Sequence, residues 1–201
     1  METKAGVLCV QFRPKLGNKK ANLKKVEDLI KPYADKQLDL ILIPEFFSTG
    51  ICHKAMINEP ENEAGGLAIE TVANLAKQYN SNILAGSVIE KSNDKLYNTC
   101  FAINRSGQTI AKYRKIHLFN YLGGTEGERI TAGNQPVVVD FDFAKVGLNI
   151  CFDIRYPLHA RKLLQMGAEI MVCPTAWAYL NSASDEEKET TKQVWQALNI
   201  A

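Results

Sequence analysis

Apolar residues along this chain recur with two different spacings, which predict an alternation of strands and helices. Short continuous apolar runs are typical of buried strands, whereas apolar residues three and four positions apart are typical of one helix face. A polar stretch rich in Asn, Glu, Pro and Gly predicts a loop over residues 48–66. The apolar runs predict strands at 6–12, 38–43, 83–90, 96–103, 108–113, 137–141, 145–150 and 169–173. The helical spacing predicts helices at 22–33, 67–79 and 158–166.

The order of these elements predicts an α/β protein with mixed sheets flanked by helices. A last helix is expected to begin near Asp185, because Ser184 and Glu187 have the spacing of a capping box. No repeat, low-complexity tract or linker divides the sequence, so we expect one domain over residues 1–201. The last helix reaches Ala201 without a C-cap signal, and we expect that the C-terminal part of this domain is missing.

Three of the predicted strands are followed by a residue of reactive type. Glu45 follows the strand at 38–43, Lys115 the strand at 108–113, and Cys151 the strand at 145–150. Taken singly, an inert core thiol and two surface charges would explain them. In open α/β sheets, however, functional groups gather at the carboxyl ends of strands. Cys151 also lies just before a helix expected to start at Pro157, and a helix N-terminus favours the reactive thiolate.

The segments 38–47, 112–119 and 146–157 resemble the signatures of the nitrilase superfamily, the carbon–nitrogen hydrolases with a Glu-Lys-Cys triad. The order of the three residues, their flanking residues and their separations all match, and the resemblance extends from Val7 to the C-terminal end of the chain. It implies a four-layer α-β-β-α sandwich that here lacks its last elements. It also implies hydrolysis without a metal or organic cofactor.

The resemblance implies catalytic roles for individual residues. Cys151 would be the nucleophile, Glu45 the proton acceptor and donor, and Lys115 the stabiliser of the oxyanion together with the backbone N–H of Phe152. A second glutamate of the family corresponds to Glu126. The nearby alternative is Glu128, and an ordinary solvated charge would also explain either position.

The resemblance also suggests which residues bind the substrate: Phe152, Arg155, Thr175 and Trp177. Trp177 could instead be a packing residue, and Arg155 could pair with Asp153 rather than with a substrate carboxylate. His159 is expected on the surface of the helix or at a subunit contact, without a catalytic role. A narrow, partly apolar cavity is expected from the aromatic residues near the three segments, namely Phe46, Phe47, Phe152, Tyr156 and Trp177.

The segment 151–157, Cys-Phe-Asp-Ile-Arg-Tyr-Pro, resembles the amidase branch of the superfamily, which includes ω-amidases. It predicts an amidase that releases ammonia from a small ω-amide of a carboxylic acid through a cysteine thioester. Leu158 replaces a glutamate common in this branch, which leaves the closer substrate assignment open. The alternatives are an N-carbamoyl amide hydrolase and a catalytically silent, nitrilase-like binding subunit.

Composition restricts the possible partners and location. A net charge of +2 does not favour nucleic acid or an anionic membrane, and no apolar run reaches membrane-spanning length. The five cysteines include no CxxC pair and the three histidines are scattered, so we expect reduced thiols and no metal site. The polar N-terminus is no signal peptide, and a cytoplasmic enzyme is expected. The resemblance adds a small-molecule amide as the substrate and a homodimer formed near residues 158–164.

Overall fold

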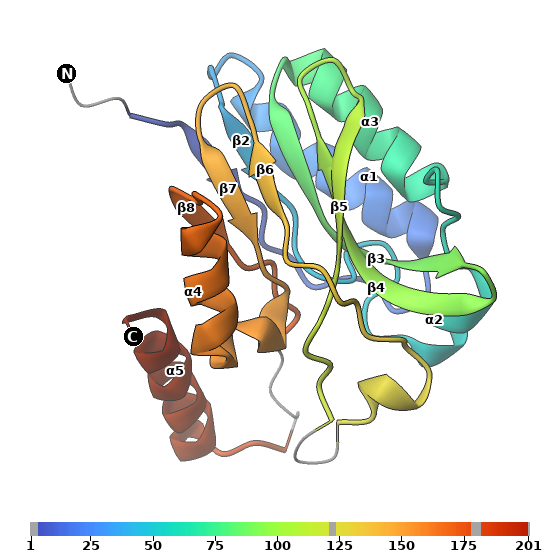
Figure 1. Ribbon diagram of the computed structural model, residues 1–201. Coiled ribbons are helices and arrows are strands. Elements are labelled where there is room, and N and C mark those ends of the chain that lie inside the picture. The colour runs from blue at the N-terminus through green and yellow to red at the C-terminus, as the bar shows by residue number, and fades with distance from the viewer. Residues whose placement is uncertain (1–3, 121–123, 178–181, 201) are drawn as a thin grey trace.

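A computed structural model describes residues 4–120, 124–177 and 182–200 and contains two β-sheets (Figure 1). The larger sheet has the strand order β1-β2-β3-β4-β5. Its first three strands are parallel, and the last two are added as antiparallel neighbours. The strands are β1 (Val7–Cys9), β2 (Leu40–Leu42), β3 (Asn82–Ser92), β4 (Lys95–Ile103) and β5 (Thr109–Arg114).

The smaller sheet has the order β6-β7-β8, with β6 antiparallel and β8 parallel to β7. Its strands are β6 (Val138–Asp140), β7 (Lys145–Leu148) and β8 (Ile170–Val172). The two sheets pack face to face through a buried apolar layer. That layer includes Leu84 and Ala102 of the larger sheet and Val146 and Leu148 of the smaller one.

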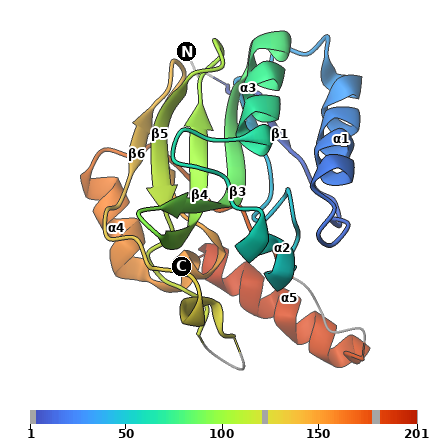
Figure 2. The same ribbon diagram turned by 90° about the vertical axis from the view of Figure 1, so that its right-hand side faces the viewer.

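Helices cover the outer faces of the two sheets. Helices α1 (Lys19–Ile30) and α3 (Leu67–Tyr79) pack on the larger sheet, where Val26 and Val72 belong to a second apolar core. Helix α4 (Pro157–Gln165) covers the smaller sheet and buries Leu163. Figure 2 shows this succession from α1 and α3 through the first sheet to β6 and α4. The observed layers confirm the α-β-β-α sandwich implied by the resemblance.

Most predicted elements are present with shifted ends, and one α-helix was missed. The region 48–66, predicted as a loop, contains the short helix α2 (His53–Asn58), which buries Ala55 and Met56. Six residues are too few to show a helical repeat in the sequence. Helix α5 (Asp185–Ile200) begins where the capping box predicted, since the N–H of Glu187 donates to Ser184 and the N–H of Ser184 donates to the Glu187 carboxylate.

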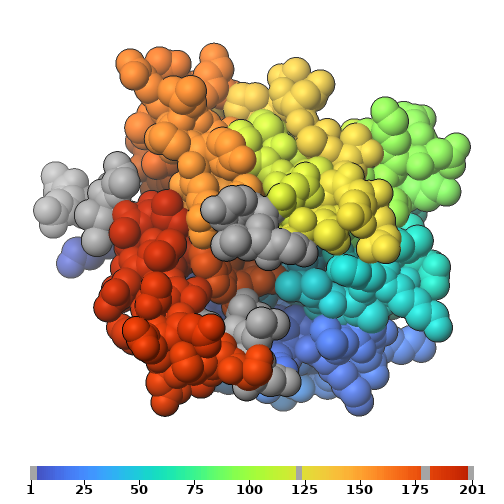
Figure 3. All heavy atoms as spheres, turned by 90° about the horizontal axis from the view of Figure 1, so that it is seen from below, coloured from blue at the N-terminus to red at the C-terminus, as the bar shows by residue number. Residues whose placement is uncertain are grey.

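The carboxyl ends of β2, β5 and β7 lie at the same end of the two sheets. Figure 3 views the molecule from this end and shows α5 beside the segment that contains the 3-10 helix η3 (Cys151–Arg155), which it contacts. The other short 3-10 helices are η1 (Lys31–Tyr33) and η2 (Glu126–Glu128). No helix in the described ranges is long and apolar enough to cross a membrane.

Candidate active site

Glu45 is placed by a sharp turn that follows β2. The backbone leaves the strand at Pro44, and Phe46 adopts a φ of 52°, in the left-handed region. The turn presses closely on β3. A side chain at Gly86 would put its Cβ 2.0 Å from the Pro44 carbonyl oxygen, so only glycine fits there. The N–H of Phe46 donates to the Ser87 hydroxyl, which fixes the turn and directs Glu45 into the interior, where its exposed fraction is 3%.

Lys115 follows β5 directly and is also buried, with an exposed fraction of 2%. Its backbone N–H donates to the carbonyl of Asn98 in β4 at 2.8 Å, so the strand pairing continues through this residue. The N–H of Gly133 donates to the carbonyl of Lys115 at 2.8 Å from the other side. The lysine backbone is thus fixed by neighbours on both sides, and its long side chain can reach only the space between the strand ends.

Cys151 occupies a strained position at the start of η3. Its φ is 46°, a conformation that costs a residue with a Cβ about 1–2 kcal/mol. Two contacts maintain it. The N–H of Cys151 donates to the Pro174 carbonyl at 3.0 Å, and the N–H of Ile150 donates to the Asp153 carboxylate at 2.9 Å. The helix α4 then begins at Pro157, as the sequence predicted.

Asp153 is fully buried behind Cys151 and holds this turn in place. Besides the N–H of Ile150, it accepts hydrogen bonds from the Tyr113 hydroxyl at 2.7 Å and from the N–H and the ring of His117 at 3.0 and 2.7 Å. Burial acts to raise the pKa of Asp153, but the hydrogen bonds from His117, Ile150 and Tyr113 outweigh it and lower the pKa below its ordinary value. The carboxylate is therefore ionised and anchors the strand end to the turn.

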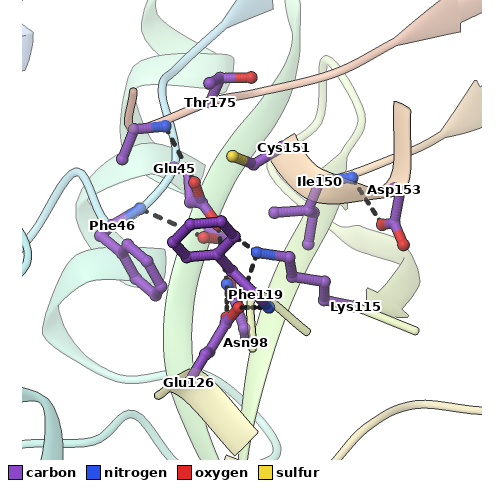
Figure 4. A network of polar contacts seen from close by, with 12 residues as sticks. Glu45, Phe46, Asn98, Lys115, Phe119, Glu126, Ile150, Cys151, Asp153 and Thr175 are labelled. Atoms are coloured by element: carbon purple, nitrogen blue, oxygen red, sulfur yellow. Dashed lines mark hydrogen bonds and ion pairs between the residues drawn. The ribbon is translucent and has the colours of Figure 1, made fainter. Parts of the chain in front are cut away.

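The side chains of Lys115, Glu45, Glu126 and Asn98 come from different parts of the chain and form one hydrogen-bonded cluster (Figure 4). Lys115 Nζ donates to Glu45 Oε1 at 3.0 Å and to Glu126 Oε2 at 2.9 Å. The amide of Asn98 donates to Glu45 Oε1 at 2.9 Å and to Glu126 Oε1 at 2.8 Å. The backbone N–H of Ala176 donates to Glu45 Oε2 at 2.9 Å. Both carboxylates are therefore fixed by hydrogen bonds, and Glu45 is the one that lies beside the Cys151 thiol (Figure 4).

Burial and the neighbouring charges shift the pKa values of Lys115 and Cys151. Burial acts to lower the pKa of Lys115, but the charges of Glu45 and Glu126 outweigh it and raise the pKa, so the lysine is charged. For Cys151, burial raises the pKa of the thiol well above its ordinary value, Glu45 raises it further, and Lys115 opposes them. Desolvation therefore outweighs the helix terminus and the lysine, which were expected to favour the thiolate. A neutral thiol of this kind needs a base to become a nucleophile, the role that the resemblance implies for Glu45.

A cavity of about 430 Å³ opens onto these groups. Cys151, Lys115, Glu45 and Glu126 all line it. Its remaining wall is largely apolar, with contributions from Phe46, Met56, Phe119, Ile130, Phe152 and Trp177. A small molecule with an apolar body and one polar reacting group would fit this space.

Comparison with known proteins agrees with this geometry. The family model for carbon–nitrogen hydrolases matches residues 7–200. The chain belongs to the carbon–nitrogen hydrolase family. A probable nitrilase of Schizosaccharomyces pombe is 32% identical over 194 residues, which cover 94% of this chain and 69% of that protein. The 2-oxoglutaramate amidase of Bacillus subtilis is 33% identical over 171 residues, which cover 85% of this chain and 64% of that protein.

The solved structures that resemble this chain include a member of the nitrilase superfamily. Nit3 of Saccharomyces cerevisiae, a member of branch 10 of the nitrilase superfamily, superposes with a TM-score of 0.81 at 26% identity. The superposition covers 96% of this chain and 69% of Nit3. This carbon–nitrogen hydrolase chain therefore spans about two thirds of the length of these relatives.

The structure distinguishes between the two candidates for the second glutamate. Glu126 contacts the lysine, and its Oε2 also accepts from the N–H of Phe119 at 2.8 Å. Glu128 lies at the end of the same short helix and is exposed. The 3-10 geometry of η2 turns only the first of these two glutamates toward Lys115.

Three of the four residues expected to bind substrate line the cavity, namely Phe152, Arg155 and Trp177. The guanidinium of Arg155 lies 5.5 and 5.6 Å from the ring centroids of Phe152 and Trp177. Its Nε is buried and has no partner within the described part of the chain. The alternative pairing of Arg155 with Asp153 is wrong, because the oxygens of Asp153 accept from His117, Tyr113 and Ile150 instead.

Some expectations for the cavity were wrong. Thr175 lines a separate depression beside Trp195 rather than this cavity, and its hydroxyl donates to the carbonyl of Cys173 at 2.9 Å. The segment 173–177 follows β8 without regular strand structure, so the proximity of Thr175 to Trp177 in the sequence did not place Thr175 in the cavity. Phe47 belongs to the core under α1 and α3, and Tyr156 stacks on His117 at a ring distance of 3.6 Å.

His159 was expected on a helix surface, but it is buried with an exposed fraction of 7%. Its Nε2 lies 3.4 Å from both the Tyr113 hydroxyl and the Leu148 carbonyl, and burial lowers the pKa of the ring. It lies on the face of α4 that packs against β7, which a nine-residue helix made hard to assign from the sequence.

Two functional neighbours were not predicted. Asn98, which bridges the two glutamates, lies in a strand whose alternating pattern gave no reason to single out one amide. Arg129 lines the cavity as a second arginine, and its guanidinium lies 3.4 Å from the His53 ring. No group of His, Cys, Asp and Glu side chains suited to hold a metal occurs among residues 4–120, 124–177 and 182–200.

Proposed function

We propose that this carbon–nitrogen hydrolase is an amidase that cleaves the C–N bond of a small ω-amide of a carboxylic acid and releases ammonia. The observation that carries the proposal is the joint placement of a neutral thiol, a charged lysine and a buried carboxylate at one cavity. Such a set supplies a nucleophile, a base and a fixed positive charge for an oxyanion. The names of relatives, such as 2-oxoglutaramate amidase, support the same class of reaction.

In the first half-reaction, Glu45 accepts the thiol proton while the sulfur of Cys151 attacks the amide carbonyl carbon and a C–S bond forms. The carbonyl oxygen becomes an oxyanion. The ammonium of Lys115 has three donors, two of which bind Glu45 and Glu126, so one N–H remains for this oxygen. The N–H of Phe152 lies in the first turn of η3, where helix geometry provides no acceptor, and it supplies a second donor.

Collapse of this intermediate breaks the C–N bond. Glu45 returns its proton to the leaving nitrogen, ammonia departs and a thioester remains on Cys151. In the second half-reaction, Glu45 takes a proton from water as the water oxygen attacks the thioester carbon. The C–S bond then breaks, the sulfur regains a proton from Glu45, and the carboxylic acid is released. The protein ends in its starting protonation state.

The cavity favours a substrate with one anionic end. Arg155 presents an unpaired donor there, and a guanidinium held between two aromatic rings can bind a carboxylate in forked geometry. The aromatic wall suits a short methylene chain between that carboxylate and the amide. We therefore propose monoamides of small dicarboxylic acids as the substrate class.

We also propose that the protein forms a homodimer through α4. Leu158 and Leu164 on this helix are large and apolar, and their exposed fractions are 78% and 55%. A second copy packed on this face would bury both side chains. Replacement of Leu158 by Asp should convert a dimer into monomers, as measured by light scattering.

The amidase proposal is tested by ammonia release from matched substrates. The panel contains a dicarboxylic monoamide, the neutral amide of the same chain length, an N-carbamoyl amino acid and a nitrile. We expect the monoamide to be hydrolysed at least tenfold faster than the others, and Cys151→Ala to abolish the reaction. Mass spectrometry after rapid quenching should detect the thioester on Cys151.

Two controls make the result specific. Arg129→Lys matches Arg155→Lys as a charge-conserving change at the same cavity, but the Arg129 side chain is exposed. The preference for the acidic substrate should be lost with Arg155→Lys and kept with Arg129→Lys. Fastest turnover of the N-carbamoyl compound would replace the amidase proposal with the carbamoyl hydrolase alternative. No turnover of any compound would favour a silent binding subunit.

A further inference from the structure

The side chain of Asn98 donates hydrogen bonds to both glutamates of the site. It lies in β4 with no exposed surface, opposite Ile89 of β3 and beside Lys115, whose backbone N–H it accepts. It does not line the cavity, so a bound substrate does not touch it. Both protons of its side-chain NH2 group are used, one on each Oε1 of Glu45 and Glu126.

The orientation of this amide is determined by its neighbours. The reversed orientation would place the amide oxygen against two carboxylate oxygens, which is repulsive. In the observed orientation the Oδ1 of Asn98 is buried without a hydrogen-bond partner in the described part of the chain. Buried acceptors are normally satisfied. The protein therefore leaves one acceptor unpaired in order to keep the NH2 group on both glutamates.

The two carboxylate oxygens of Glu45 accept different numbers of hydrogen bonds. Oε1 accepts from Asn98 and from Lys115, and an ionised carboxylate oxygen has about two lone-pair directions. Oε2 accepts from the N–H of Ala176, which leaves one lone-pair direction for the Cys151 thiol, and a hydrogen bond to Glu45 is among the causes that raise the pKa of that thiol. Figure 4 shows the Cys151 sulfur beside the Glu45 carboxylate, on the side away from Asn98. The unoccupied direction and the thiol are on the same side of the carboxylate.

We propose that Asn98 is a positioning residue that makes Oε2 of Glu45 the only oxygen able to take the thiol proton. By binding Oε1 it stops the carboxylate from rotating, and by binding Glu126 it fixes the second partner of Lys115. Asn98 thus sets the direction of proton transfer and the place of the lysine through one side chain. This inference rests on the proposed amidase mechanism.

The test compares Asn98→Ala with Thr99→Val. Thr99 is the next residue in β4, points to the opposite face and is equally buried, and its hydroxyl donates to another buried carboxylate, Glu90, at 2.8 Å. Both changes remove uncharged donors to carboxylates, two N–H donors at Asn98 and one hydroxyl at Thr99, but only Asn98 acts on the reacting groups. For Asn98→Ala we expect kcat to fall about 10- to 100-fold, as for misplaced catalytic groups, with KM changed less than about 2-fold. Thr99→Val should keep kcat within about 2-fold.

The variant Asn98→Asp is nearly isosteric and gives a readout that a structural role would not move. The introduced carboxyl would face Glu45, Glu126 and Lys115, and it can donate to a glutamate only while it is protonated. We expect kcat to be highest at acidic pH and to fall as the pH rises, a shape absent from the unsubstituted protein. If Asn98→Ala fails to fold, this profile decides the proposal alone.

Alkylation separates this inference from the proposed function. The rate of iodoacetamide reaction at Cys151, followed by mass spectrometry, does not require a substrate. It should fall in Asn98→Ala and stay unchanged in Thr99→Val, since only the former loses the aligned base. Equal alkylation rates and equal kcat in the two variants would overturn the role of Asn98. An unsubstituted protein that hydrolyses no amide, yet shows the alkylation difference, would overturn the amidase proposal and leave the role of Asn98 standing.

Discussion

Replacement of Lys115 by Met removes the positive charge that lies between Glu45 and Glu126 while keeping an unbranched side chain of similar length. Lys115 is buried and makes charged hydrogen bonds of 3.0 and 2.9 Å. A charged hydrogen bond contributes about 1.5–3 kcal/mol, so the two together contribute about 3–6 kcal/mol. Breaking a buried ion pair costs about 3–5 kcal/mol, a range that agrees with this sum. We expect the free energy of unfolding to fall by about 4 kcal/mol at pH 8.

The pH dependence of this loss follows from the two carboxylates left behind. In the folded Lys115→Met variant, Glu45 and Glu126 repel each other without a cation, so the folded state takes up a proton more readily than the unfolded chain. Proton uptake stabilises the folded state as the pH falls. The stability difference from the unsubstituted protein should therefore be largest at pH 8 and shrink toward pH 5.

The double variant Lys115→Met, Glu126→Gln provides the matched control, because it removes one positive and one negative charge together. It should regain about half of the lost stability. Turnover should not return, since removal of an oxyanion donor costs about 3–4 kcal/mol in the barrier, or about 10²–10³-fold in kcat. Urea unfolding followed by circular dichroism measures stability, and ammonia release measures turnover. A single variant with unchanged, pH-independent stability, or with turnover within tenfold of the unsubstituted protein, would refute the reasoning.

Further predictions concern the nucleophile, its anchor and the cavity arginine. Cys151→Ala should lose turnover while its unfolding free energy changes by less than about 1 kcal/mol, since the change removes only one small sulfur atom, which contributes little to packing. The rate of alkylation of Cys151 should still increase above pH 9, because burial raises the pKa of this thiol. Cys100, whose pKa burial raises to about 12, should resist labelling. The exposed Cys9 must first be replaced by Ser. Asp153→Asn should cost about 1.5–3 kcal/mol at pH 7. Because the pKa of Asp153 is lowered on folding from 3.8, its contribution is complete above that value and is lost as the pH falls, so both proteins should converge in stability toward pH 2. Arg155→Lys should raise KM for acidic amides more than for neutral ones, and equal effects on both would exclude carboxylate recognition by Arg155.

The sequence predicted two of the strand ends that carry the reactive residues because each lies at a sharp change from apolar to polar residues. Glu45 and Cys151 follow continuous apolar runs, and such runs have few alternatives to a buried strand. Lys115 follows a mixed strand, and its segment 112–119 was identified from the family resemblance. The helix at Leu67–Tyr79 was predicted with its exact bounds, since its apolar face repeats over three turns and it ends at Asn80, which adopts the left-handed conformation that commonly closes a helix.

What could not be predicted depends on contacts between distant segments. Asn98 is important only because β4, β5 and η2 bring its side chain, Lys115 and Glu126 together, and no local sequence pattern indicates that contact. Glu126 was predicted from the family resemblance and not from such a pattern. The protonation state of Cys151 could not be inferred either, since it depends on how much water the folded cavity excludes. Thr175 was misplaced for a related reason, because an extended segment without a partner strand gives no sign of which side faces the cavity.

The contact between the two indole rings makes this protein's fluorescence a local signal. The chain has only two tryptophans, and the rings of Trp177 and Trp195 lie 4.9 Å apart in an edge-to-face arrangement. Trp177 forms part of the cavity wall beside the Arg155 guanidinium, and Trp195 belongs to α5. All tryptophan emission therefore arises at one corner of the cavity. Ligand affinity can be measured from that emission in a protein without a label and without turnover, so candidate substrates can be ranked on Cys151→Ala before any product is sought.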